Sequence, residues 1–286
     1  MSRRVLFVVR SGSNQAPDVA RVAAQGLIES GIEVACAHDD AQLLNVRGVT
    51  SSDDASGCEL VVVFGGDGTI LSGIELARPA DVPVLGVNLG HVGFLAEAEP
   101  EDIHAVVHAI VDHNWRVEER LTLEVHVDGP EQQQWQSWAL NEVAIEKDAR
   151  ERMIQIMVSV DERPLSQWSA DGLLCSTPTG STAYAFSAGG PVVWPEVDAM
   201  LVVPISAHAL FARPLVVAPS SSVDVNVIKG PVVISADGRR TTEVSAGSTV
   251  RIVRHQQPTK LARLHLVPFT ERLVAKFELP VQGWGA

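Results

Sequence analysis

The first third of the sequence alternates short apolar runs with segments of helical periodicity. The run LVVVF at residues 60–64 has no polar position, which is typical of strands in a parallel sheet covered on both faces. The predicted strands lie at residues 5–9, 32–35, 60–64 and 84–87, and the predicted helices at 17–30, 69–77 and 100–111. Strands and helices that alternate in this order predict a doubly wound, mostly parallel sheet.

The pattern changes to strict alternation in the second part of the chain. Residues 121–127, 154–160 and 223–227 place apolar side chains at every second position. A period of two predicts half-buried strands. Turn sequences such as Asp128-Gly129-Pro130 and Asp237-Gly238 separate these runs. We therefore predict an antiparallel, all-β sandwich for this part of the chain.

The two patterns predict a domain boundary near residues 115–120. We assign residues 1–116 to the α/β domain and residues 117–267 to the β-sandwich domain. Residues 268–286 are predicted to form a helix, at 269–277, and a tail that returns to the first domain.

Composition and charge exclude several classes of protein. The chain has 286 residues, 46% of them hydrophobic, which is enough for one large or two ordinary domains. Its net charge of −13 disfavours general binding to nucleic acid or to anionic membranes. The apolar run after Arg4 is too short for a signal peptide or a membrane span. The isolated cysteines Cys36, Cys58 and Cys175 indicate neither a disulfide framework nor a zinc site, and they fit the cytoplasm.

The first candidate site is the glycine-rich turn GGDGT at residues 65–69, between a predicted strand and a predicted helix. Its glycines allow a bulky anion to approach, and a helix N-terminus presents free N–H groups. The carboxylate of Asp67 repels phosphate, so it suits a proton acceptor or the holder of a divalent cation instead. The same residues also make a good ordinary turn. Their place at the carboxyl end of a parallel strand favours a site.

The second candidate is the hydroxyl-rich segment STPTGSTAY at residues 176–184, which follows Asp171. Hydroxyl groups donate and accept hydrogen bonds, so they suit sugar and phosphate oxygens. Thr179 or Ser181 is expected to cap a helix that runs to Ser187. The ring of Tyr184 suits stacking near a base or a ribose, although a core tyrosine is equally ordinary.

The third candidate is the pair Asn141-Glu142. An amide beside a carboxylate is suited to the two hydroxyls of a ribose. The pair alone is weak support for a site, because exposed strand positions often carry glutamate.

Together these segments resemble the NAD kinase family. The family has a Gly-Gly-Asp-Gly-Thr turn, an Asn-Glu pair, and an Asp-Gly followed by Thr-Pro-Thr-Gly-Ser-Thr-Ala-Tyr, and all three occur here in the same order. The sequence NLGHVGFL at residues 88–95 extends the resemblance, which covers residues 5–277. The hydroxyl-rich motif is highly specific, whereas lipid kinases and phosphofructokinases carry turns related to the aspartate turn.

The resemblance implies an α/β domain and a dinucleotide-binding β-sandwich domain with an active site between them. It implies transfer of a phosphoryl group from ATP or polyphosphate to the 2′-hydroxyl of the adenosine ribose of NAD, with Asp67 as the catalytic residue. It further implies magnesium at the phosphates, with no side chain assigned as a metal ligand, and a homodimer or homotetramer with a shared site. The predicted binding residues are Gly66, Gly68, Thr69, Phe94, Asn141, Glu142, Asp171, Thr179, Thr182, Ala183, Tyr184 and Ser187.

Two other functions remain open at this point. A kinase for a lipid or a sugar phosphate would account for the GGDGT turn, but not for the hydroxyl-rich segment beside Asn141-Glu142. A non-catalytic dinucleotide sensor would keep the ribose-binding residues and would not need Asp67. The sequence also leaves open the phosphoryl donor, the choice of NAD or NADH, the size of the oligomer, its regulation, and the roles of Asp237, Arg239 and Arg240.

Overall fold

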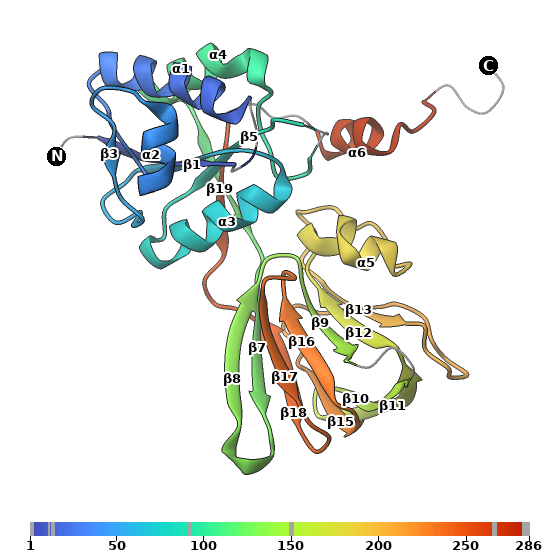
Figure 1. The fold of residues 1–286 in the computed structure, drawn as a ribbon. Helices are drawn as coiled ribbons and strands as arrows, with labels where there is room; N and C mark the ends of the chain where they lie inside the picture. Colours follow the sequence, from blue (N-terminus) through green and yellow to red (C-terminus); the bar gives the residue numbers. More distant parts are fainter. Residues whose placement is uncertain are drawn as a thin grey trace. The chain divides into compact units, whose positions relative to one another are not determined.

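The chain forms two compact units in the computed structural model, which describes residues 3–10, 12, 15–90, 93–148, 152–264 and 268–281. The first unit consists of Met1–Glu119 and Thr259–Ala286, and the second of Arg120–Pro258 (Figure 1). The chain therefore leaves the first unit once and returns to it once.

One sheet forms the centre of the first unit. In spatial order its strands are β3 (Thr50–Ser51), β2 (Glu33–Cys36), β1 (Arg4–Val9), β4 (Leu60–Phe64), β5 (Val84–Val87), β19 (Thr259–Arg263) and β6 (Arg116–Arg120). Neighbouring strands from β3 to β19 run parallel. The sequence of β4 has no polar residue because every one of its side chains is buried.

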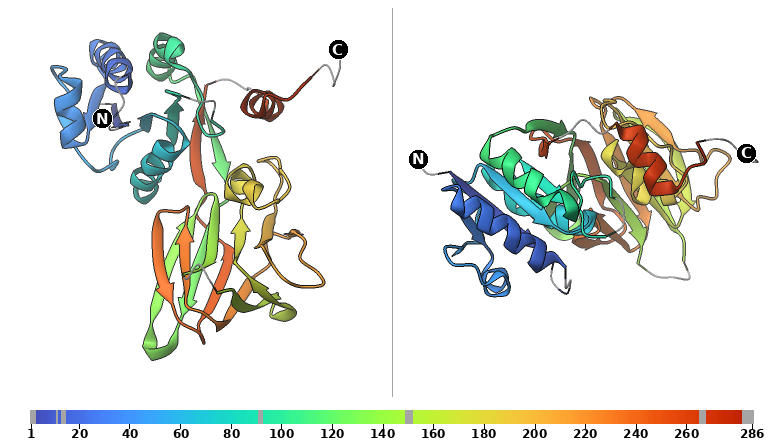
Figure 2. Two further views of the ribbon diagram at one scale, coloured as in Figure 1. Left: turned by 45° about the vertical axis from the view of Figure 1, so that its right-hand side comes forward. Right: turned by 90° about the horizontal axis from the view of Figure 1, so that it is seen from above.

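Helices cover both faces of this sheet. They are α1 (Ala16–Glu29), α2 (His38–Leu44), α3 (Asp67–Ala77) and α4 (Ile103–Val111), with short 3₁₀ turns η1 (Arg78–Ala80) and η2 (Pro100–Asp102). A further helix of this unit, α6 (Phe269–Phe277), has no buried residue and does not cover the sheet. Figures 1 and 2 show α1 and α4 on one face and α3 on the other. Val62 and Phe64 of β4 join the core with α1 and α4. Gly73 of α3 lies on the opposite face, where an added Cβ would be 2.3 Å from Val63 Cγ2.

The second unit is a sandwich of two antiparallel sheets. One contains, in spatial order, β11 (Arg163–Ala170), β10 (Ile154–Val160), β15 (Val223–Lys229), β18 (Thr249–Arg254), β7 (Leu123–Asp128) and β8 (Gln134–Ala139). The other contains β14 (Leu215–Val217), β13 (Met200–Ile205), β12 (Gly172–Ser176), β9 (Glu142–Lys147), β16 (Val232–Ala236) and β17 (Arg240–Val244). Three short helical segments complete the unit: η3 (Pro130–Gln132), η4 (Thr179–Thr182) and α5 (Tyr184–Ser187).

The core of the sandwich comes from the alternating positions of its strands. Val223, Val225 and Val227 of β15 are buried together with Trp168 of β11, which is fully buried. The predicted fold class, an α/β part followed by an all-β sandwich, is confirmed.

The end of the sandwich differs from the sequence-based boundary. Residues 117–267 were assigned to one domain, but Thr259–Arg263 forms β19, which pairs in parallel with β5 in the first unit. The reason is that the sequence TKLAR carries no feature that specifies one sheet over another. The predicted helix at 269–277 is confirmed as α6 and belongs to the first unit, whereas the tail at 282–286 lies outside the described residues.

Candidate active site

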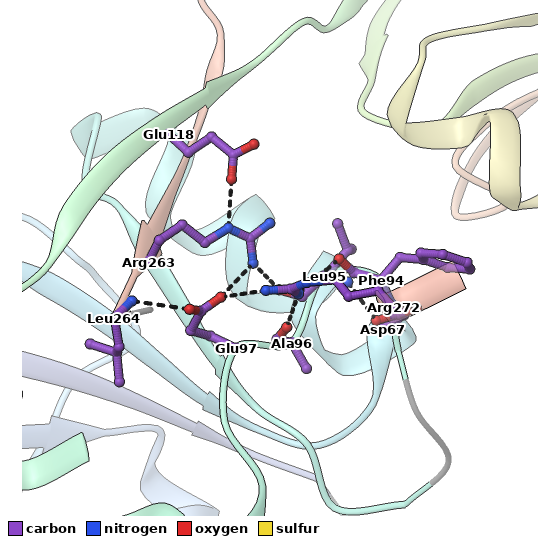
Figure 3. A network of polar contacts seen from close by, with 9 residues as sticks. All are labelled: Asp67, Phe94, Leu95, Ala96, Glu97, Glu118, Arg263, Leu264 and Arg272. Carbon is purple, nitrogen blue, oxygen red and sulfur yellow. Dashed lines mark hydrogen bonds and ion pairs between the residues drawn. The ribbon is translucent and has the colours of Figure 1, made fainter. Parts of the chain in front are cut away.

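Asp67 is the first residue of α3 and follows directly from the end of β4. An acidic side chain in the first turn of a helix is stabilised by the positive end of the helix dipole. Its carboxylate accepts two backbone hydrogen bonds, from Phe94 N–H to Oδ2 at 3.0 Å and from Leu95 N–H to Oδ1 at 3.1 Å (Figure 3). Each oxygen is thereby fixed and keeps a free lone pair, so the carboxylate can still accept a proton or a further hydrogen bond.

The glycines of the GGDGT turn have different roles. An added Cβ at Gly65 would lie 2.5 Å from Thr69 Oγ1, so Gly65 makes room for the side chain of Thr69. Gly66 and Gly68 have no atom within 4 Å of an added Cβ. The space that a side chain at either position would occupy is therefore empty, which leaves the backbone beside Asp67 accessible.

Phe94 contacts the last helix of the first unit. Its ring centroid lies 5.7 Å from that of Phe269 and 6.1 Å from that of Phe277, both in α6. Phe94 thus connects Asp67, through its N–H group, with α6, through its ring. The neighbouring His91 and Val92 lie outside the described residues.

The Asn141-Glu142 pair in the second unit is held by Asp237. The Asp237 carboxylate accepts hydrogen bonds from Leu140 N–H at 2.9 Å and Asn141 N–H at 2.7 Å, and its own N–H donates to Glu142 O at 3.0 Å. Arg240 donates to Asp237 Oδ2 at 2.9 Å. Burial raises the pKa of Asp237 to about 6, although backbone hydrogen bonds from Leu140, Asn141 and Glu142 act in the opposite direction. The sequence did not indicate a role for Asp237. In the structure its side chain holds the backbone of residues 140–141.

Three hydroxyl groups of the hydroxyl-rich segment, which the sequence suggested for a ligand, donate to backbone carbonyl groups instead. Ser176 Oγ donates to Asn141 O at 2.9 Å, Thr177 Oγ1 donates to Leu140 O at 2.5 Å, and Ser181 Oγ donates to Pro178 O at 2.7 Å. All three hydroxyl side chains are fully buried. Their effect is to hold the segment against residues 140–141.

The predicted helix up to Ser187 is wrong in two respects. The segment forms η4 and α5, which are separated at Ala183 by non-helical backbone angles of −100° and −127°. The hydroxyl that caps η4 belongs to Thr177, which accepts a hydrogen bond from Gly180 N–H at 3.1 Å, rather than to Thr179 or Ser181. Thr179 Oγ1 instead accepts a hydrogen bond from the buried Arg120 at 3.3 Å.

Gly180 brings this segment into direct contact with the Asn-Glu pair. An added Cβ at Gly180 would lie 2.0 Å from Asn141 O. Only a glycine permits so close an approach of two backbones. The sequence signal for this contact was the glycine itself.

Glu142 is buried, with 7% of its surface exposed. Burial, the nearby Asp237 and Glu146 raise its pKa to about 8, against the effect of a hydrogen bond from Tyr184 N–H. Its Oε2 atom is buried and has no hydrogen-bond partner among the residues that the structure describes. A buried acceptor without a partner costs free energy, which a ligand hydroxyl at this point would recover.

The other predicted residues of the second unit lie just before β12, in η4, between η4 and α5, and in α5. Tyr184 is partly exposed and its hydroxyl donates to Glu146 Oε1 at 2.7 Å, so it is no core tyrosine. Asp171 forms an ion pair with Lys147 at 2.5 Å. Thr182 donates to Thr179 O at 3.3 Å, and Ser187 ends α5 with its side chain exposed.

The structure therefore gathers the predicted residues into two clusters, one in each unit. The first surrounds Asp67, and the second surrounds Asn141-Glu142. Sequence reasoning missed Glu97, Arg263 and Arg272, near Asp67, where both arginines bind Glu97 (Figure 3). Within the part of the chain that the structure describes, no group of three or more His, Cys, Asp or Glu side chains is placed to hold a metal ion.

The chain is similar to known proteins over most of its length. The family model of the ATP-NAD kinase N-terminal domain matches residues 5–115, and that of the C-terminal domain matches residues 140–264. The NAD kinase of Thermobifida fusca (strain YX) is 47% identical over 298 residues, which cover 99% of this chain and 91% of that protein. The chain belongs to the NAD kinase family.

Other NAD kinases share the same extent of similarity. NAD kinase 2 of Streptomyces coelicolor is 48% identical over 290 residues, covering 99% of this chain and 96% of that protein. The solved structure of yeast NADH kinase complexed with NADH superposes with a TM-score of 0.92 at 21% identity, over 100% of this chain and 90% of that chain. The solved structure of an NAD kinase from Archaeoglobus fulgidus in complex with ATP superposes with a TM-score of 0.73 at 24% identity. The match covers 97% of this chain and 99% of that chain. These two structures show that the fold is that of NAD kinases.

Proposed function

We propose that this chain makes NADP by transferring the terminal phosphoryl group of ATP to the 2′-hydroxyl of the adenosine ribose of NAD. Its membership of the NAD kinase family makes it an enzyme that phosphorylates NAD. The fixed carboxylate of Asp67 beside an open glycine turn is the observation that supports the proposed chemistry.

Asp67 is the proposed acceptor of the hydroxyl proton. Phosphoryl transfer depends on positioning and on neutralisation of charge more than on covalent chemistry. A carboxylate held by two N–H groups cannot rotate freely, and its free lone pairs can orient the 2′-hydroxyl and accept its proton. The attacking oxygen then forms the bond to phosphorus while the bond to the leaving phosphate breaks.

Asn141 and Glu142 are the proposed holders of the ribose. With its pKa near 8, the Glu142 carboxyl group is protonated near neutral pH and can both donate and accept a hydrogen bond. A ribose hydroxyl has the same capacity. Such a hydroxyl would give Glu142 Oε2 the partner that the described residues do not provide. Tyr184 lies at the exposed edge of this cluster, where its ring can stack on the dinucleotide.

Magnesium is the proposed cofactor at the donor phosphates. The donor set fits this ion, because magnesium commonly binds substrate phosphates together with one or two carboxylates rather than a complete protein cage. Asp67 would be the carboxylate nearest to the ion, and the open backbone at Gly66 and Gly68 would receive the phosphates. When bound, magnesium neutralises negative charge on the phosphates.

A coupled assay tests the proposed function. The purified protein is incubated with NAD, magnesium and either ATP or polyphosphate, and NADP is measured with an NADP-specific dehydrogenase. We expect NADP from ATP, no NADP after chelation by EDTA, and recovery when magnesium is added back. Polyphosphate in place of ATP shows whether the donor site accepts a phosphate chain without a nucleoside.

Asp67→Asn tests the role of the carboxylate. Loss of a positioned general base typically lowers turnover about 10²- to 10⁴-fold. We expect this fall in kcat with little change in the KM for NAD. The control is Asp18→Asn, because the Asp18 side chain is 72% exposed and contacts Arg21 on the surface. Near-normal turnover of Asp67→Asn would overturn the assignment of Asp67 as the base.

We also propose that copies of this chain associate through the edge of the sandwich. β14 is the edge strand of its sheet, and an edge strand presents unpaired N–H and C=O groups. Val216 on β14 is 60% exposed, and the nearby Leu210 and Phe211 are also exposed. Light scattering of the protein as it elutes from a size-exclusion column should give the mass of at least a dimer. The variant Val216→Asp should give the mass of a monomer.

The cytoplasm is the proposed location. Cys36, Cys58 and Cys175 are all free thiols and buried, as expected in a reducing compartment. In the part of the chain that the structure describes, no helix combines the length and apolar character needed to cross a bilayer. Fractionation of cells that express the tagged chain tests this location.

A further inference from the structure

We propose that Glu97, Arg263 and Arg272 are positioning residues for Asp67, and that they act through the backbone of Phe94 and Leu95. This inference rests on the proposed function of Asp67 in the reaction. The inference concerns these three charged side chains, which lie near Asp67 and are drawn with it in Figure 3.

The peptide groups of two consecutive residues link the two sides of this arrangement. Phe94 and Leu95 both donate their N–H groups to the Asp67 carboxylate, at 3.0 and 3.1 Å. The C=O group of Phe94 accepts a hydrogen bond from Arg272 Nη1 at 3.4 Å, and that of Leu95 accepts one from Arg263 Nη1 at 3.2 Å. Each residue thus holds Asp67 on one side and is held by an arginine on the other.

Glu97 holds the two arginines in place. Its side chain is 0% exposed and accepts hydrogen bonds from Arg263 Nη1 at 3.0 Å, from Arg272 Nη2 at 2.7 Å and from Leu264 N–H at 3.1 Å. Buried charged hydrogen bonds of this kind are strong, and removing one partner leaves the other charges without compensation. Arg263 Nε also donates to Glu118 Oε2 at 2.6 Å.

The contacts come from elements that are far apart in the sequence. Arg263 lies on β19, Arg272 on α6 and Glu118 on β6, whereas Asp67 begins α3. Arg272 also donates to Ala96 O, so one guanidinium group binds three residues of the segment, Phe94, Ala96 and Glu97. The segment at 93–97 is therefore held between α3 on one side and β19 and α6 on the other. We call the contacts of Glu97, Arg263 and Arg272 with this segment the clamp.

Loss of this clamp should affect turnover more than binding. The arginines bind carbonyl groups and Glu97 and are not among the residues proposed to hold the ribose. When they are removed, the N–H groups of Phe94 and Leu95 lose their fixed position, and with them the Asp67 carboxylate. A displacement of about 1 Å in a reacting group can cost about 10²-fold in rate.

The experiment compares Arg272→Met with the wild-type chain, and with Lys276→Met as the control. Lys276 lies in the same helix and is exposed, so its replacement removes a charge without touching the clamp. Two quantities are measured: kcat and KM for NAD, and the rate of amide hydrogen exchange of a peptide that covers residues 93–97 in the ligand-free protein. For Arg272→Met we expect kcat to fall between about tenfold and 10²-fold, an unchanged KM and faster exchange.

Each outcome decides the proposal. If Arg272→Met has the kcat and the exchange rate of Lys276→Met, the positioning role is overturned. A rise in KM at unchanged kcat overturns it too. If Arg272→Met does not fold, Arg272→Lys replaces it. Lysine keeps a positive charge beside Glu97 but has no planar fork for the carbonyl groups of Phe94 and Ala96. For this variant kcat should fall, and amide exchange at residues 93–97 should be faster. A wild-type chain that makes no NADP would contradict the proposed function, while the exchange rates would still test the clamp.

Discussion

Gly93 and Asp67 are in direct contact: a Cβ added to Gly93 would lie 2.3 Å from Asp67 Oδ1 and 3.0 Å from Asp67 Cγ. The glycine immediately before Phe94 and Leu95 therefore lets the carboxylate reach both of their N–H groups. There is therefore no space for a side chain at position 93, beside the carboxylate of the proposed base, Asp67.

Gly93→Ala should therefore lower turnover without unfolding the protein. The new methyl group displaces the Asp67 carboxylate, and a shift of about 1 Å can cost about 10²-fold in rate. The measurement is kcat for NAD phosphorylation, with thermal unfolding as a check on the fold. Gly90→Ala is the matched control, because an added Cβ there meets no atom within 4 Å. Equal turnover in the two variants would contradict the prediction.

Asp237→Ala should destabilise the protein and weaken NAD binding. The replacement leaves the N–H groups of Leu140 and Asn141 without an acceptor, at about 1–3 kcal/mol for each buried group. Arg240 loses one of its hydrogen-bond partners as well. Urea unfolding measures the first effect, and titration with NAD measures the second. The control is Asp224→Ala, because Asp224 forms a partly exposed ion pair with Arg251. A variant as stable as this control would show that Asp237 does not hold the turn.

Glu142→Gln should change how stability depends on pH. The pKa of Glu142 is raised to about 8 in the folded chain from an ordinary value of 4.5, so the folded state binds the proton more tightly than the unfolded state. This contribution is fully present below about pH 4.5 and is lost as pH rises to about 8. Glutamine does not titrate. We therefore expect wild type to lose stability relative to Glu142→Gln between these pH values, in urea unfolding at intervals of pH. A constant difference would show that the pKa of Glu142 is not raised in the folded chain.

Gly180→Ala should separate the hydroxyl-rich segment from the Asn-Glu pair. The added Cβ would lie 2.0 Å from Asn141 O, which is a backbone atom and has little freedom to move. Forced overpacking of this kind costs about 1–3 kcal/mol. We expect a lower unfolding temperature and weaker NAD binding. Ser187→Ala, at an exposed position, serves as the control for stability. Unaltered stability and affinity would mean that the contact is not needed.

The regular elements and the two site clusters could be predicted because local patterns determine them. The buried run at 60–64 became β4, and Asp67 lies where a turn after a parallel strand places it. The close approach at Gly180 and the turn at Asp237-Gly238 also follow from residue types that tolerate unusual backbone.

What could not be predicted depends on contacts between distant parts of the sequence. Arginines in a strand and in a helix are normally exposed, so nothing local indicates that Arg263 and Arg272 meet at Glu97. The hydroxyl groups of Ser176, Thr177 and Ser181 have the composition of a ligand site, but their partners are carbonyl groups that only the fold brings near. Asp237 is likewise recognisable as a turn residue but not as the anchor of residues 140–141.

The neighbouring positions of β6 and β19 have a consequence for the order of events on the ribosome. Residues 121–258 separate these two strands in the sequence, so the whole sandwich is synthesised before β19 and α6 exist. Domains generally fold as units while the chain grows. The sandwich can thus fold on a growing chain in which Asp67 is already made but Arg263 and Arg272 are not. We expect a nascent chain to fold its sandwich first and to fix Asp67 later, so that activity begins only after Arg263 and Arg272 have been synthesised.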